Sequence, residues 1–291
     1  MSNPNYGDIA KEARRTVLRL IYSAQTSHIG SNFSAIDIMA VLFEKFDWNK
    51  DKFVLSAGWK AASLYYFLWK YGRITEEELN SYCQEVSCPY NNCDCGIETG
   101  SNSRNICFRC GGTGKVQSKF IGLSEPVHPD ISIAGGSMGL GICGAAGLAL
   151  AKKLKGEEGK VYVLMSDGEM AIGTTHESAL IARQHNLNNL VVIIDKNGFQ
   201  AMGETEKILS IEPLASLWNA WGWDVRKVNG HDYKALDEVF AYLPDSRPTV
   251  VIANTTKGKG VSWMENNNLY HYKNLSEEEY QLALKELNDL Y

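Results

Sequence analysis

Three short apolar runs in the second half of the chain constrain its fold more than any other feature. Residues 160–167 (KVYVLMSD), 190–195 (LVVIID) and 248–254 (PTVVIAN) have the length of strands and are almost wholly apolar. Parallel strands covered on both faces have this composition, whereas half-exposed antiparallel strands alternate apolar and polar residues. Helical patterns separate the runs. This alternation predicts an α/β fold with a doubly wound, mostly parallel sheet.

Composition is consistent with one globular domain over residues 1–291. Hydrophobic residues make up 44% of the chain and charged residues 22%, which excludes disordered and collagen-like proteins. A chain of this length buries a large core without disulfides. The formal net charge is −5. An acidic chain has no basic footprint, so we expect neither nucleic acid nor an anionic membrane as a partner.

The sequence also predicts a cytoplasmic protein. The start of the chain, MSNPNYGDIAKEARR, is polar and lacks the apolar core of a secretory signal. Residues 131–151 carry no charge but contain six glycines and two serines. This composition favours a buried helix of a soluble protein over a membrane span.

Capping patterns predict where two helices begin. Ser34 is followed three residues later by Asp37, which predicts a helix over residues 34–46 with Ser34 as its N-cap. Thr75, followed by EEELNSY, predicts a second helix start.

Cysteines concentrate in one polar stretch. Six of the seven cysteines lie between Cys83 and Cys110, inside residues 83–119, which show neither helical nor strand periodicity. We interpret residues 83–119 as a Cys-rich insertion within the domain. In an intracellular protein, clustered thiols favour a metal site over disulfides.

The spacing of these cysteines predicts the type of metal. Cys93-x-Cys95 and Cys107-x-x-Cys110, the latter followed by glycines, form two pairs that suit tetrahedral zinc. Three alternatives stay open. Cys83 or Cys88 could replace Cys93, the site could hold an iron–sulfur cluster, or the loop could carry disulfides or inert thiols.

The first two apolar runs end in residues that suit a divalent cation. Asp167 is followed by Gly168 and Glu169, and Asn197, 30 residues after Asp167, is followed by Gly198. If the two strands are neighbours, a carboxylate and an amide oxygen meet at one edge of the sheet. These ligands suit Mg²⁺ or Ca²⁺, with a carbonyl, water and ligand phosphates at the other positions. Taken alone, Asp-Gly and Asn-Gly pairs are more often ordinary turns.

Together with other segments, these residues resemble a known family. Ser166-Asp-Gly-Glu and the later Asp195-Lys-Asn-Gly-Phe-Gln resemble the thiamine diphosphate signature, a Gly-Asp-Gly followed one helix and one strand later by Asn. Further segments resemble the amino-terminal half of transketolase: SHIGSNFSAIDIMAVLF (27–43), KDKFVLSAGW (50–59), GGSMGLGICGAAGLALA (135–151), and ANTTKGKGVSWMENN with LYHY (253–272). The resemblance covers nearly the whole chain outside 83–119. It implies the thiamine diphosphate-binding fold, in the type of domain that holds the diphosphate (the PP domain).

The resemblance also implies roles for individual residues. Asp167 and Asn197 would bind Mg²⁺ through their side chains, and Phe199 through its carbonyl. His28 and His271 fall where the family has histidines facing the substrate; they would polarise its carbonyl and move protons. The cofactor-binding residues implied in this way are Gly136, Ser137, Met138, Asp167, Gly168, Glu169, Asn197 and Trp59.

A partner follows from the same resemblance. In full-length transketolases a pyrimidine-binding domain and a C-terminal domain follow this one, and the pyrimidine domain supplies the catalytic glutamate. We therefore expect a split enzyme, with a separately encoded C-terminal subunit in an α₂β₂ heterotetramer. The implied reaction transfers a two-carbon ketol unit from a ketose, phosphorylated or otherwise anionic, to an aldehyde.

Four positions depart from the family pattern. Ser166 replaces the first glycine of the signature, Trp59 and Leu123 stand where the family has histidines, and Ile172 replaces a common glutamate. The loss of the two histidines predicts a donor or acceptor other than the usual pentose phosphates. Two alternatives remain: another thiamine enzyme, such as a 2-oxo acid decarboxylating transferase or a deoxyxylulose-phosphate-synthase-like ligase, and a zinc-bearing scaffold without activity.

Overall fold

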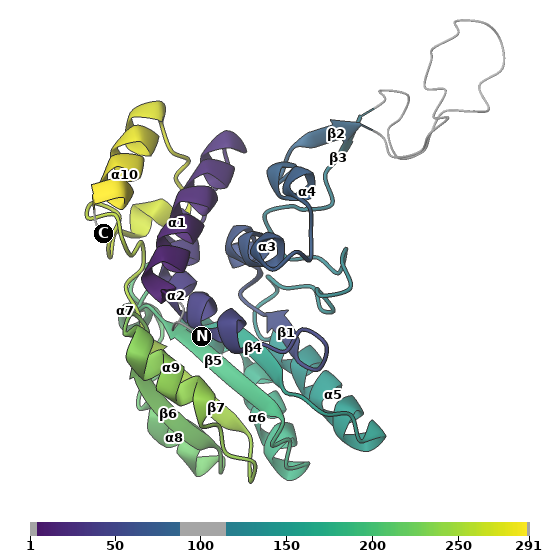
Figure 1. Ribbon diagram of the computed structural model, residues 1–291. Coiled ribbons are helices and arrows are strands. Elements are labelled where there is room, and N and C mark those ends of the chain that lie inside the picture. Colours follow the sequence, from purple (N-terminus) through teal and green to yellow (C-terminus); the bar gives the residue numbers. More distant parts are fainter. Residues whose placement is uncertain (1–4, 88–114, 290–291) are drawn as a thin grey trace, which may run out of the picture.

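A five-stranded parallel sheet forms the centre of the computed structural model, which describes residues 5–87 and 115–289 (Figure 1). Every neighbouring pair of strands in this sheet is parallel, as predicted. Across the sheet the strands run in the order β1 (Lys52–Leu55), β4 (Val161–Ser166), β5 (Leu190–Lys196), β7 (Thr249–Asn254) and β6 (Asp224–Asn229).

Helices cover both faces of this sheet (Figure 1). One face packs against α1 (Tyr6–Ser23), α2 (Ile29–Lys45), α3 (Ala61–Lys70) and α9 (Tyr233–Ala241), with α10 (Glu277–Asp289) outside α1. The other face packs against α5 (Leu140–Lys155), α6 (Gly173–Gln184) and α8 (Leu214–Ala220). Shorter elements are α4 (Glu76–Asn80), α7 (Thr205–Ile208) and the 3-10 helices η1 (Gly58–Lys60), η2 (Asp167–Ala171) and η3 (Asn268–His271). Within the described ranges, no helix combines the length and the apolar character needed to cross a membrane.

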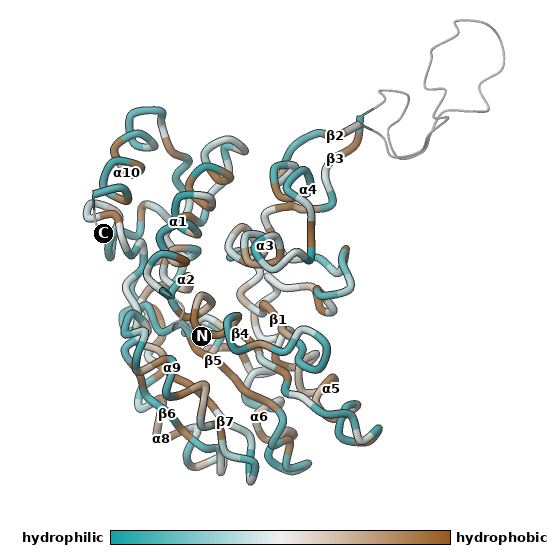
Figure 2. The backbone as a smooth tube through the Cα atoms, viewed as in Figure 1, coloured by the Kyte–Doolittle hydropathy of each residue, from teal (hydrophilic) through white to brown (hydrophobic). Residues whose placement is uncertain are grey.

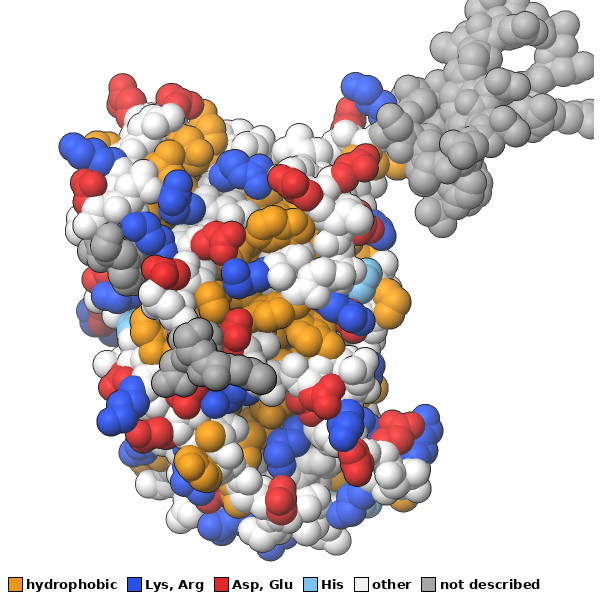
Figure 3. Space-filling view, in the orientation of Figure 1, with side chains coloured by type: hydrophobic (Ala, Val, Ile, Leu, Met, Phe, Trp, Pro, Cys, Tyr) orange, Lys and Arg blue, Asp and Glu red, His pale blue; other side chains and the backbone are white. Residues whose placement is uncertain are grey.

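Two separate hydrophobic cores explain why the strands are apolar throughout. In β5, Val191 and Ile193 face the core under α1 and α2, whereas Val192 and Ile194 face the core under α5 and α6. Successive side chains of a strand point to opposite faces, so a strand covered on both faces needs apolar residues at every position. Figure 2 shows the strands in the middle of the sheet as mainly brown, with teal on the outer turns of the helices. Acidic and basic side chains are interspersed on the face in Figure 3.

The stretch predicted as an insertion begins and ends in a small ribbon. Strand β2 (Glu85–Ser87) pairs antiparallel with β3 (Lys115–Gln117). Residues 88–114 lie outside the described part of the chain, and with them Cys93, Cys95, Cys107 and Cys110.

Helix α2 begins earlier than predicted. It starts at Ile29 rather than after Ser34, and residues 29–43 are all buried. The prediction that Ser34 caps this helix is wrong. Its hydroxyl donates to Asp195 Oδ2 at 2.6 Å, and Asp37 bonds to α1. Ser34 and Asp37 resemble a capping box in the sequence, but in the structure they connect α2 to β5 and to α1. The predicted capping box at Thr75 is confirmed.

A buried ion pair joins α1 to α2. Arg14 is 1% and Asp37 is 2% exposed, and two hydrogen bonds of 2.9 and 2.7 Å connect the guanidinium to the carboxylate. His231 Nδ1 lies 2.7 Å from Asp37 Oδ2, and the Tyr233 hydroxyl donates to Asp37 Oδ1 at 2.9 Å. Burial alone would raise the pKa of Asp37, but Arg14 and His231 hold it well below its ordinary value.

We predict that Asp37→Asn lowers the free energy of unfolding by about 3–5 kcal/mol, because it removes the negative charge opposite a buried guanidinium. A carboxylate with a depressed pKa stabilises the fold above its unfolded pKa of about 4, and this contribution is lost as the pH falls below that value. The difference between wild type and variant should therefore shrink below about pH 4. Urea unfolding of the purified wild-type and variant chains at several pH values measures this difference in the free energy of unfolding.

The control is Asp245→Asn, whose side chain is 88% exposed; we expect it to change the unfolding free energy by less than about 0.5 kcal/mol. A loss for Asp37→Asn as small as that of the control would contradict the structural role of the ion pair.

Candidate functional site

The carboxyl ends of β4 and β5 lie side by side and bring Asp167 and Asn197 to one edge of the sheet. Ser166 and Asp195 are directly opposite each other in the parallel ladder. Just beyond, the backbone N–H of Gly198 donates to Asp167 Oδ2 at 2.8 Å. The predicted neighbourhood of the two strands is confirmed, and the turn after β5 is bonded directly to the carboxylate that follows β4.

The donor set at this edge fits a hard divalent cation. Asp167 is fully buried, and its Oδ1 accepts the N–H of Gly168 at 2.9 Å. Burial, together with the nearby Asp195 carboxylate, raises the pKa of Asp167 to about 6. A bound cation would offset the cost of burying this negative charge, and carboxylate and amide oxygens are the ligands that Mg²⁺ prefers. Asn197 Oδ1 accepts the N–H of Phe199 at 3.1 Å and, as a carbonyl oxygen, has a second lone pair for an ion.

Two buried groups whose roles were not apparent from the sequence lie directly behind Asn197. Lys60 and Asp195 are both fully buried, and 2.7 Å separates the ammonium from Asp195 Oδ2. Burial alone would raise the pKa of Asp195, but the Lys60 ammonium and the hydrogen bonds to this carboxylate hold it below its ordinary value. The sequence signals were a lysine next to Trp59 in a family motif and an acid closing an apolar run.

The glycine-containing loop before α5 lies next to this edge. Gly136 has a φ of 103° and donates its N–H to Ser56 O at 3.1 Å. Ser137 and Met138, also predicted to bind the cofactor, are exposed on the loop. Gly139 caps α5 with a φ of 80°. The positive end of a helix of this length favours an anionic group such as a diphosphate.

Glu169 connects this loop to the turn after β4. It is fully buried, and its carboxylate accepts the N–H of Gly139 at 3.1 Å, the N–H of Ser166 at 2.9 Å and the Ser56 hydroxyl. Burial raises the pKa of Glu169. Because these hydrogen bonds come from both the loop and the turn, the Glu169 carboxylate holds the two segments together.

Three departures from the family pattern gather around the same loop. A Cβ on Gly136 would lie 2.9 Å from a methyl group of Leu123, and one on Gly139 would lie 2.7 Å from a methyl group of Ile172. Trp59 belongs to η1, and Gly58, the first residue of η1, packs against the backbone of the loop. Changes that are far apart in the sequence therefore alter one small region of the site.

The two predicted catalytic histidines are in contact. The ring centroids of His28 and His271 are 4.9 Å apart. The backbone N–H of His28 donates to the backbone carbonyl of His271 at 3.1 Å. His28 has a φ of 73° as the N-cap of α2. The backbone of a residue other than glycine is strained in this left-handed region, and such strained residues are more frequent at functional sites than elsewhere.

A buried lysine lies beside this histidine pair. Lys257 is fully buried, and its ammonium lies 2.8 Å from His271 Nδ1 and 2.7 Å from Asn268 Oδ1. Burial and the Lys257 charge lower the pKa of His28 to about 4 and that of His271 to about 3. Both imidazoles are therefore neutral at pH 7. Because an ammonium only donates, Nδ1 of His271 accepts, and the ring proton is on Nε2.

Lys257 also connects the histidines to the end of β5. Its ammonium lies 5.7 Å from the ring centroid of Phe199, two residues after Asn197. Burial, followed by repulsion from Lys60, lowers the pKa of Lys257 to about 8. Lys257 lies in a segment that resembles the family, but nothing in the sequence indicated a role for this residue.

The predicted zinc site lies outside the described residues. Within residues 5–87 and 115–289, no cluster of three or more His, Cys, Asp or Glu side chains is arranged to hold a metal ion. Cys83 and Cys143 are free thiols. A magnesium site that is completed by ligand phosphates needs only one or two carboxylates from the protein, and the buried Asp167 would supply one.

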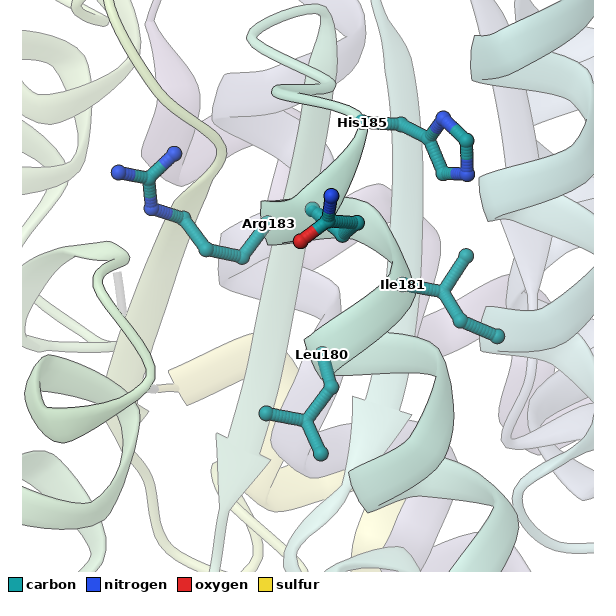
Figure 4. Close-up of a pocket in the computed structure, with 5 residues that line it drawn as sticks. Leu180, Ile181, Arg183 and His185 are labelled. Carbon is teal, nitrogen blue, oxygen red and sulfur yellow. The ribbon is translucent and has the colours of Figure 1, made fainter.

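A depression on the outer surface of α6 is separate from these residues. Its lining consists of Leu180, Ile181, Arg183, Gln184 and His185, at the end of the helix (Figure 4). The lining shares no residue with the edge formed by β4 and β5 or with the histidine pair, so the depression is not part of the candidate site.

Comparisons with known proteins agree with this geometry. Residues 113–288 match the model of the family described as transketolase, thiamine diphosphate binding domain. The chain is 32% identical to a protein of Actinobacillus succinogenes named as one subunit of apulose-4-phosphate transketolase, over 99% of this chain and 98% of that protein. It is 30% identical to the protein of the same name from Phocaeicola vulgatus, over 96% and 92%.

The fold is also that of a solved structure. The transketolase of Campylobacter jejuni superposes with a TM-score of 0.78 at 23% identity, covering 98% of this chain and 43% of that one. The chain thus spans less than half the length of this transketolase, but nearly all of the two relatives that are named as transketolase subunits. On the family match and these identities, the chain belongs to the transketolase family and carries its thiamine diphosphate binding domain.

Proposed function

We propose that this chain is the N-terminal subunit of a split transketolase that transfers a two-carbon ketol unit from an anionic ketose to an aldehyde. The observation that carries this proposal is the bond from the Gly198 N–H to Asp167, which joins the two halves of the thiamine diphosphate signature at one sheet edge. A decarboxylating thiamine enzyme is not favoured, because the matched family and relatives are transketolases.

The chain's own residues would bind and orient the cofactor. Asp167, Asn197 and the carbonyl of Phe199 would hold Mg²⁺. The diphosphate would lie against Gly168, Trp59 and the loop at Gly136, Ser137 and Met138, near the positive end of α5. Glu169 would keep the loop and the metal-binding turn in register. When bound, thiamine diphosphate supplies the carbon chemistry of the transfer.

The histidine pair would act on the substrate. A neutral imidazole can polarise a carbonyl by donating a hydrogen bond, and it can accept a proton from a hydroxyl group. His271 presents Nε2–H because Lys257 occupies its other nitrogen. The Ser27 hydroxyl lies 2.7 Å from His28 Nδ1 and orients that ring. Both groups are thus set for hydrogen bonding at neutral pH.

A separately encoded C-terminal subunit would complete the enzyme. We propose that it carries the pyrimidine domain and the catalytic glutamate, in an α₂β₂ heterotetramer. The two relatives named as transketolase subunits match over nearly their full length, which supports this division. Both are named for apulose-4-phosphate. Together with the three altered positions around the glycine loop, this favours a phosphorylated sugar other than the usual pentose phosphates.

We also propose that residues 83–119 form an insertion that binds zinc through Cys93, Cys95, Cys107 and Cys110. The spacing of the two cysteine pairs supports this. The metal would fold a polar stretch that has little apolar material of its own.

We predict that Asp167→Ala abolishes Mg²⁺-dependent binding of thiamine diphosphate to the complex with the partner subunit, because the substitution removes the only charged side chain proposed to bind the ion. Calorimetric titration of the cofactor in the presence and absence of Mg²⁺ measures the effect. The control Asp245→Ala removes an exposed carboxylate and should bind like wild type. Magnesium-dependent uptake by Asp167→Ala equal to that of wild type would refute the assignment.

We predict that His271→Gln lowers kcat/KM for ketol transfer by about 10²–10⁴-fold, the range typical of a lost acid–base group, with cofactor affinity unchanged. His28→Gln should behave in the same way. Steady-state kinetics and cofactor titration on the same preparations separate the two effects. His185→Gln, on the outer surface of α6, is the control. If a histidine variant lost cofactor binding instead of turnover, its proposed role toward the substrate would be wrong.

We predict about one zinc ion per chain in protein purified without added metal, as in a closed four-cysteine site. Elemental mass spectrometry measures the zinc content per chain. Cys107→Ser should lose the zinc, whereas Cys143→Ser, which alters a cysteine outside the cluster, should retain it. Protein that contains neither zinc nor iron would exclude a metal site in the insertion.

A further inference from the structure

The buried pair Lys60–Asp195 lies directly behind a proposed ligand of Mg²⁺. The Lys60 ammonium donates to Asp195 Oδ2 and to the carbonyl of Ser31, each at 2.7 Å. Neither side chain of the pair is exposed to solvent. Burying two charges is costly, and such a pair contributes little net stability compared with apolar residues of similar size. The pair therefore calls for a role besides packing.

The same carboxylate oxygen also holds the Asn197 side chain. Asp195 Oδ2 accepts Asn197 Nδ2 at 3.2 Å, and Ser34 Oγ, which donates to Asp195 Oδ2 at 2.6 Å, lies 3.5 Å from Asn197 Nδ2. The nitrogen of this carboxamide is thus held against Asp195. Its oxygen is left on the opposite side, where it accepts the N–H of Phe199.

The orientation of Asn197 decides whether it can bind a cation. An amide has a donor end and an acceptor end of nearly the same shape, and only the oxygen end binds Mg²⁺. A carboxylate behind the nitrogen selects one orientation, because a carboxylate oxygen only accepts hydrogen bonds. Lys60 keeps that carboxylate in place and compensates its charge beside Asp167.

We propose that Lys60 is a positioning residue for the magnesium site: through Asp195 it holds the carboxamide of Asn197 with its oxygen toward the ion. This inference rests on the proposed function, because it concerns the same metal site. It adds a residue that touches neither the ion nor the cofactor. Groups that orient metal ligands in this way typically change metal affinity 10- to 100-fold when they are replaced.

The test uses the variant Lys60→Met, which keeps a chain of similar length without its charge, in the complex with the partner subunit. Equilibrium dialysis at a fixed concentration of thiamine diphosphate measures cofactor uptake as Mg²⁺ is increased. We expect the Mg²⁺ concentration for half-maximal uptake to rise about 10- to 100-fold. A merely structural role would reduce the fraction of competent complex, and hence the maximal uptake, but would leave this midpoint unchanged.

Two further variants complete the design. Lys152→Met replaces a mostly buried lysine that donates to Lys50 O at 2.8 Å, on the far end of α5, and its midpoint should equal that of wild type. Ser34→Ala removes one neutral donor to Asp195 and should raise the midpoint several-fold. If Lys60→Met does not assemble, Ser34→Ala tests the shared link through Asp195, and an unchanged midpoint in that variant would overturn the positioning role.

The outcomes separate this inference from the proposed function. Wild-type complex without Mg²⁺-dependent uptake of the cofactor would overturn both. Wild-type uptake with unchanged midpoints in Lys60→Met and Ser34→Ala would overturn only the positioning role. A raised midpoint in these variants and an unchanged one in Lys152→Met would establish it.

Discussion

The parallel pairing of β4 with β5 is the constraint on which the whole site depends. Its register puts Ser166 opposite Asp195, and the residues that follow then meet at one edge. The bond from the Gly198 N–H to Asp167 closes this edge. A shift by one residue would move each side chain of the strand from one core to the other, and it would separate the residues that follow β5 from those that follow β4. The site therefore depends on this register.

Buried charge organises the chemistry around this edge. Asp195 is compensated by Lys60, while Lys257 donates to two neutral partners, Asn268 and His271. Burial, and after it the Lys257 ammonium, lowers the pKa of both histidines and keeps the two imidazoles neutral. Negative charge thus lies at the ends of the strands, where a cation fits, and positive charge lies behind the groups that would face a carbonyl.

The altered positions suggest where this chain differs from other transketolases. Leu123, Ile172 and Trp59 gather around the loop before α5. Leu123 and Ile172 make apolar contacts with this loop, at positions where the family pattern has a histidine and a glutamate. Substrate differences within a family commonly arise in loops that a rigid sheet holds in place. The sheet itself has the fold of the solved transketolase.

Residue patterns predicted the sheet and the meeting of Asp167 with Asn197, because buried parallel strands require apolar runs and ligands bind where such strands end. The resemblance of several motifs predicted the family. They did not reveal Ser34, Lys60 or Lys257. Asp195 lies 161 residues from Ser34 and 135 from Lys60, and local periodicity carries no record of such contacts. Ser34 even resembled a helix cap. Only the tertiary structure, by burying these groups together, decided which polar residues support the site and in which protonation state.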